Sequence, residues 1–183
     1  LLYPNLNRIP EYIRSGNMDF FLLKPISAQF MVSFRYLRVW MLPQLLLGFA
    51  VMGYGMARLG QLTPTNVGLT LLLLACGLLT VYALWFALLT TSFWLVKVGN
   101  IGELFNAFFQ AGRFPTSAFP TWARLFLTIV VPIAFVTTVP ASAAVGRGGA
   151  GLVLGGVGVA AALLAASHAF WRYAVANYTS ASS

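Results

Sequence analysis

Four stretches of this chain contain no Asp, Glu, Lys or Arg and are long enough to cross a lipid bilayer as helices. They cover residues 39–57, 59–96, 125–146 and 148–171. About 20 apolar residues of helix cross a bilayer core about 30 Å thick. Charged residues make up only 8% of the chain, whereas a typical soluble domain contains roughly 25%, so a soluble fold is excluded.

Helical spans are predicted here in preference to a membrane β-barrel. A barrel strand alternates polar and apolar residues over about ten positions, but Ala160–Ala166 is apolar on every side. The predicted fold class is therefore all-α, a polytopic transmembrane helical protein in a single domain, 1–183. Its clear spans are expected at 39–57, 67–96 and 151–172.

The basic residues orient the chain in the membrane. Five of them precede the first span, and only Arg58 lies in the turn that follows it. The five are Arg8, Arg14, Lys24, Arg35 and Arg38. Loops rich in Lys and Arg stay in the cytoplasm, so the N-terminal segment and the tail 173–183 are predicted to be cytoplasmic. The same rule accounts for the net charge of +8, and no nucleic-acid partner is predicted.

Residues 1–26 are the most polar stretch and carry the signals of a short helix. Asn7 is placed to cap its start, Pro10 suits its first turn, and Gly16 suits its end. One face of this helix would present exposed apolar side chains, from Ile9, Tyr12 and Ile13. Because exposed apolar patches commonly mark an interaction site, a protein partner is predicted on this segment.

A long helix is expected to follow. Ser27 is placed to cap it, and it is predicted to run without interruption from Ala28 through Ala57 into the first span.

The stretch 101–145 has two interpretations. Pro132 and Pro140 lie in its apolar half, and prolines inside a membrane helix need neighbouring protein to satisfy the freed carbonyl groups. A segment that re-enters the membrane is one possibility. A simple span at 124–145 is the other, and it requires 97–123 to be cytoplasmic.

No catalytic or metal-binding group is predicted. His168 has no carboxylate within a helical turn to orient it, so a buried or pore-facing histidine is expected. Cys76 lies in an apolar run, which favours a packing role, and Glu103 is expected in the headgroup region. The Walker A pattern G-x-x-x-x-G-K-[ST] is absent from the sequence, so no cofactor is expected on this chain and ATP dependence requires a partner.

The last span carries small residues at helical spacing. Gly151, Gly155 and Gly158 lie there, and small side chains let a second helix approach closely. That second helix belongs either to the same chain or to another subunit.

Three segments together resemble the ABC-2 family of ABC transporter permeases, in a bacterial branch whose permeases work in pairs. The first is Arg14–Ser27, with Gly16, Asp19 and the run Lys24-Pro25-Ile26-Ser27 before a span. The second is Gly112–Leu125, with Pro115 and Pro120, followed by Pro132 and Pro140. The third is the C-terminal run from Phe170 to Ser182.

The resemblance implies a transmembrane domain like that of type V exporters, with two N-terminal spans of a six-span subunit missing from this sequence. It also implies a short span beginning at 101–112, with 115–145 re-entering from outside. A separate ATP-binding subunit would hold ATP and Mg, and a second ABC-2 permease subunit would complete the translocation path. The expected location is the bacterial inner membrane.

On this resemblance the chain is a permease subunit of an ATP-driven exporter, and 1–26 is its coupling segment. The alternative is a non-transporting membrane scaffold or anchor. The coupling interface is predicted at Ile9, Glu11, Tyr12, Ile13, Arg14, Gly16, Asp19, Lys24 and Pro25. The re-entrant segment is predicted at Pro115, Pro120, Pro132 and Pro140, and helix packing at Gly151, Gly155 and Gly158.

The re-entrant interpretation can be tested by cysteine labelling. In a background without Cys76, Thr116→Cys and Ser142→Cys should each react with a membrane-impermeant thiol reagent from the extracytoplasmic side. Labelling of Thr116→Cys from the cytoplasmic side alone would instead support four simple spans.

Overall fold

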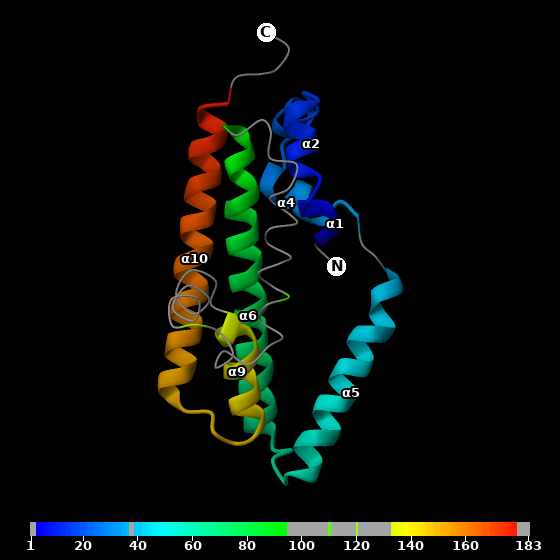
Figure 1. Cartoon of the computed structure of the whole chain (residues 1–183), viewed down its shortest axis with the longest axis vertical. Coiled ribbons are helices and arrows are strands. Elements are labelled where there is room, and N and C mark those ends of the chain that lie inside the picture. Colours follow the sequence, from blue (N-terminus) through cyan, green and yellow to red (C-terminus); the bar gives the residue numbers. More distant parts are fainter. Residues whose placement is uncertain (1–2, 37–38, 95–109, 111–119, 121–132, 179–183) are drawn as a thin grey trace.

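The computed structural model describes residues 3–36, 39–94, 110, 120 and 133–178, and every regular element within them is helical (Figure 1). The elements are α1 (Tyr3–Leu6), α2 (Ile9–Arg14), α3 (Met18–Leu22), α4 (Ala28–Phe34), η1 (Val39–Met41), α5 (Leu42–Arg58), α6 (Pro64–Thr90), η2 (Thr91–Phe93), α9 (Ile133–Ala144) and α10 (Ala150–Ala176). The predicted all-α class is confirmed for this part of the chain.

Three of these helical segments are long and apolar enough to cross a membrane. They are Val39–Arg58, Pro64–Phe93 and Ala150–Ala176, and they coincide closely with the predicted windows. The most apolar window of the second is 39% buried, against 17% for the third and 6% for the first. α6 is therefore the central helix, with α10 and α9 packed along it, while α5 leans away from the other helices (Figure 1).

The start of α6 lies earlier in the chain than predicted. The helix begins at Pro64 rather than at residue 67, and Thr63 accepts a hydrogen bond from the Asn66 backbone N–H at 3.3 Å. Proline is well suited to the first helical position, where its missing N–H is not needed. Pro64 therefore starts the span instead of interrupting it.

The predicted continuous helix from Ala28 through Ala57 is wrong. Ser27 does cap α4, accepting from the Phe30 backbone N–H at 3.4 Å, but α4 ends at Phe34. α5 begins at Leu42, with Pro43 in its first turn. Proline has no N–H to donate to the carbonyl four residues earlier, so Pro43 suits the first turn of a new helix.

Two turns lie together at one end of the molecule. The α5–α6 turn and the α9–α10 turn are at the end opposite α1–α4 (Figure 1). They touch at Gln61 and Gly146, where a Cβ on Gly146 would clash with the Gln61 side chain. α9 therefore ends beside the start of α6.

Part of the predicted re-entrant segment lies outside the described residues. This holds for Pro115, Pro132 and the expected short span, so the choice between the two interpretations of 101–145 stays a prediction. Pro120 is exposed, and Pro140 is buried inside α9. Close by, the Ser142 hydroxyl donates to the Thr138 carbonyl at 2.8 Å, which supplies a side-chain hydrogen bond in the turn that proline weakens.

Gly146 should be intolerant of substitution. Its φ is +79°, which costs a non-glycine residue about 1–2 kcal/mol, and the added methyl would displace Gln61. We expect Gly146→Ala to lower the Tm in detergent by about 2–4 °C for each kcal/mol lost. Gly151→Ala is the matched control, because Gly151 lies inside α10 and a Cβ there would meet no atom of the described residues within 4 Å. It should leave the Tm unchanged or raise it, and equal losses for the two variants would contradict the argument.

Candidate functional site

The first 34 described residues, 3–36, fold into one unit that we call the headpiece. Its four short helices, α1–α4, lie at the end of the molecule where α6 and α10 finish (Figure 1). Buried side chains from the headpiece, α6 and α10 form one cluster, made of Leu6, Ile9, Met18, Phe21, Val32, Trp85, Phe86, Leu89 and Trp171. The headpiece is thereby attached to both long helices at once.

Aromatic rings gather where α6 and α10 end. Trp171 contacts Phe86 at 4.9 Å and Phe93 at 5.4 Å between ring centroids, whereas Trp94 stacks on Phe170 at 5.5 Å and on Tyr173 at 5.9 Å. Trp and Tyr are enriched at membrane–water interfaces. We therefore expect this end of the two spans, with the headpiece beside it, near the lipid headgroups.

The predicted apolar face of α2 exists, but its predicted exposure is wrong. Ile9 is fully buried in the cluster, and Tyr12 and Ile13 are half-buried against it. The Tyr12 ring lies 4.9 Å from that of Phe21. These side chains attach α2 to the ends of α6 and α10, so they are not a free surface.

The predicted helix start is also shifted. The residue that precedes α2 is Arg8, and Asn7 does not cap the helix. Arg8 has φ −87° and ψ −11°, a helical conformation, whereas a side-chain cap requires an extended one.

The remaining predicted coupling residues lie on the outer surface of the headpiece or in its turns. Glu11 and Arg14 are exposed on α2, and Lys24 and Pro25 are exposed after α3. Gly16 makes the turn between α2 and α3 with φ +71°, a conformation that favours glycine. Asp19 is half-buried in the first turn of α3.

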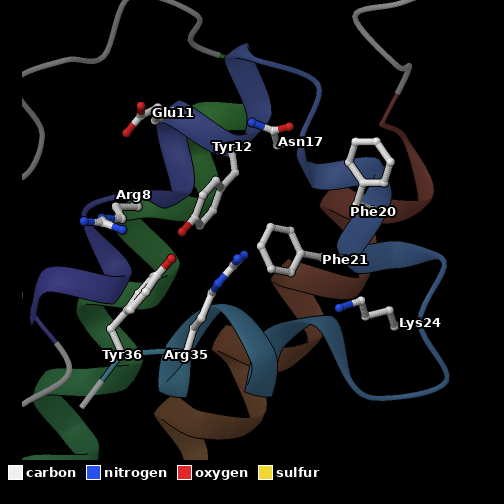
Figure 2. Close-up of a pocket in the computed structure, with 9 residues that line it drawn as sticks. All are labelled: Arg8, Glu11, Tyr12, Asn17, Phe20, Phe21, Lys24, Arg35 and Tyr36. Carbon is white, nitrogen blue, oxygen red and sulfur yellow. The ribbon is translucent and has the colours of Figure 1, made fainter.

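A cavity of about 590 Å³ opens in the headpiece, and we call it the basic pocket (Figure 2). Its lining residues are Arg8, Glu11, Tyr12, Asn17, Phe20, Phe21, Lys24, Arg35 and Tyr36. Three of them are cationic and one is a carboxylate. Figure 2 shows the hydroxyls of Tyr12 and Tyr36 facing each other, with the guanidinium groups of Arg8 and Arg35 on either side of them, whereas the Glu11 carboxylate points away.

Aromatic rings hold the two guanidinium groups in place. Arg8 lies 4.7 Å from the centroid of the Tyr36 ring, and Arg35 lies 5.2 Å from Phe21 and 5.4 Å from Tyr36. The Tyr12 side chain, through hydrogen bonding first, and then Tyr36 raise the pKa of Arg8 above its ordinary value. Arg8 is therefore cationic at every physiological pH.

Asn5 positions one wall of this pocket. Its side-chain amide donates to the Tyr36 carbonyl at 2.7 Å, and its carbonyl oxygen accepts from the Tyr36 N–H at 2.9 Å. Asn5 is 1% exposed. The sequence analysis missed Asn5, Tyr36 and Phe21 as site residues, because a contact across 31 positions leaves no local pattern.

His168 is exposed rather than buried in the described part of the chain, and whether it faces a pore stays a prediction. Its Nδ1 lies 2.7 Å from Gln29 Oε1, so an amide on α4 orients the ring. Nearby, Ser33 Oγ lies 2.9 Å from the Tyr82 hydroxyl. These two contacts join α4 to α10 and to α6 beside an apolar groove of about 370 Å³.

The predicted packing glycines lie on the outer face of α10. Gly151, Gly155 and Gly158 are exposed, and a Cβ on each would meet nothing within 4 Å in the described part of the chain. The buried residues of α10 are a different set, which includes Gly156, Ala160 and Ser167, and α6 is the described helix with which α10 packs most extensively. The packing partner of Gly151, Gly155 and Gly158 therefore stays a prediction, and within the described residues it is not α6.

The described residues hold no group of three or more His, Cys, Asp or Glu side chains that could bind a metal ion. The chemistry that these residues offer is instead recognition of an anion by the basic pocket and contact with a partner through the outer face of α2.

Three helices long and apolar enough to span a membrane, among described residues that form only helices, define a multi-pass, all-helical membrane protein. A family model described as "ABC-2 family transporter protein" matches residues 1–182. The chain belongs to this family, whose members typically lack an ATPase domain and work with a partner ATPase. No curated protein matches the chain, and no solved structure does.

The Asn5 contact predicts a specific weakness of the headpiece. Asn5→Ala removes two hydrogen bonds and leaves the Tyr36 backbone without them, which should cost about 1–3 kcal/mol. We expect a lower Tm and faster proteolysis between α4 and α5. Asn17→Ala is the control, because Asn17 is exposed and its amide bonds only to Ser15. It should change stability by less than about 0.5 kcal/mol, and indistinguishable variants would refute the positioning role of Asn5.

Proposed function

We propose that this chain is a transmembrane permease subunit of an ATP-driven ABC exporter. It contributes half of the translocation path, and a second ABC-2 permease contributes the other half. ATP and Mg are held by a separate ATP-binding subunit. The proposed location is the bacterial inner membrane, with the headpiece and the C-terminus in the cytoplasm.

The observation that carries this proposal is the headpiece. It is folded, packed on the ends of α6 and α10, and located at the end of the molecule that the basic residues orient toward the cytoplasm. A rigid unit attached to two spans is suited to receive a force and pass it into the membrane. The family membership supports an ATPase as the source of that force.

The outer face of α2 is the best candidate for the docking surface. Glu11 and Arg14 are three residues apart, so they share a face of the helix, and both are exposed. Opposite charges on one rigid face set the register of a partner and exclude others. The buried face, with Ile9 against the cluster, keeps α2 from moving independently.

A charge swap tests this surface without disturbing the core. Glu11→Lys combined with Arg14→Glu keeps the net charge, but it places each charge opposite the wrong group of the partner. We expect normal membrane insertion, at least about a tenfold loss of co-purified ATPase, and loss of transport-coupled ATP turnover in reconstituted membranes. Tyr12 is unsuitable for this test, because its ring packs against Phe21.

Arg147→Glu is the matched control, since Arg147 is exposed at the opposite end of the molecule. It should leave ATPase binding unchanged. Full retention of ATPase binding and turnover in the charge-swap variant would exclude this face as the coupling surface. Failure to find any associated ATPase with the unaltered chain would favour the non-transporting scaffold.

A further inference from the structure

We propose that the basic pocket binds the phosphate of an anionic phospholipid headgroup from the cytoplasmic leaflet. The proposal concerns the lateral opening of the headpiece rather than the outer face of α2. It stands whether or not the chain couples to an ATPase.

The pocket has the chemistry of a phosphate site. Arg8 and Arg35 enter it from different elements, and the hydroxyls of Tyr12 and Tyr36 face the same space (Figure 2). A guanidinium offers several donors in a planar fork that suits phosphate oxygens, and a phenol adds a further donor. The ring contacts of both arginines already hold them in position, so little side-chain entropy is lost when an anion binds.

The charge balance favours an anion over a neutral ligand. Arg8, Lys24 and Arg35 line the cavity with Glu11 as the single carboxylate, which leaves an excess of two positive charges (3 − 1 = 2). The Glu11 side chain points away from the pocket (Figure 2). A volume of about 590 Å³ falls within the roughly 300–1,000 Å³ that small-molecule sites occupy, enough for a phosphate with its attached polar group.

The position of the pocket next to the first span favours a lipid over a soluble phosphate. Arg35 and Tyr36 lie immediately before the first span, which begins at Val39. Trp40 is 95% exposed and Phe20, on the pocket wall itself, is 68% exposed. Large exposed apolar side chains beside a cationic cavity match the boundary between headgroups and acyl chains.

The test measures lipid binding to the full chain without any ATPase. Phosphatidylglycerol is titrated onto the detergent-purified protein and bound lipid is counted by native mass spectrometry, with phosphatidylcholine for comparison. Each cation close to an anionic headgroup contributes about a fivefold factor in affinity. Arg8→Gln with Arg35→Gln should therefore weaken phosphatidylglycerol binding about thirtyfold, and the phosphatidylcholine signal should be weak throughout.

Arg14→Gln with Arg172→Gln is the matched control. It removes the same charge from two exposed residues that do not line the pocket, and it should change the affinity less than twofold. Lys24→Gln distinguishes loss of lipid binding from loss of folding, because Lys24 is exposed and lies outside the buried cluster. It should weaken binding about fivefold with an unchanged Tm.

Three outcomes would overturn the proposal. They are equal losses in the pocket and control pairs, equal binding of phosphatidylcholine, and displacement of the lipid by millimolar glycerol phosphate. The third would assign the pocket to a soluble phosphate.

Discussion

The attachment of the headpiece to the ends of α6 and α10 determines the arrangement of the rest of the chain. Inside the bilayer, these two helices gain little from hydrophobic association, because lipid tails are as apolar as their side chains. Beyond the bilayer, removing a large apolar side chain from water contributes about 1.5–3 kcal/mol. Phe86, Trp171 and Ile9 are buried together at this boundary. The cluster therefore stabilises the helix pair at the end that carries the headpiece.

α5 depends on this attachment although it barely touches the other spans. Its chain leaves the headpiece at Tyr36, which Asn5 holds through two hydrogen bonds, and it returns through the turn that leads to Pro64. Between these two anchors, 6% of its most apolar window is buried. Because the helix is interrupted before Pro43, a displacement of the headpiece would reach α5 through a joint rather than along a continuous rod. Rigid-body motion about such a joint is a common form of switching.

The sequence predicts the strongly constrained parts of this fold and misses those that depend on tertiary contacts. Charge-free windows locate the three long helices, since a charged side chain inside the bilayer is costly. Pro43 marks the start of α5, but no proline or glycine between Phe34 and Val39 marks the end of α4, so the interruption could not be predicted from local signals. The apolar periodicity of Ile9, Tyr12 and Ile13 identified a packing face without revealing its partner, because an amphipathic helix buries the same face against its own chain or another. The pairing of Asn5 with Tyr36 follows no local rule and becomes visible only when the headpiece is folded.

Mixed charge on the N-terminal segment is an objection to a membrane-surface role, since a helix lying on anionic lipid carries a more uniformly basic polar face. The folded headpiece removes that objection by separating the charges in space. Glu11 points outward from α2, while Arg8 and Arg35 converge on the pocket between the elements (Figure 2). One small unit thus carries a mixed-charge outer face on α2 and a separate cationic pocket. Salt screens the interaction of exposed charges beyond about 8–10 Å. The face of α2 and the basic pocket can therefore bind different partners.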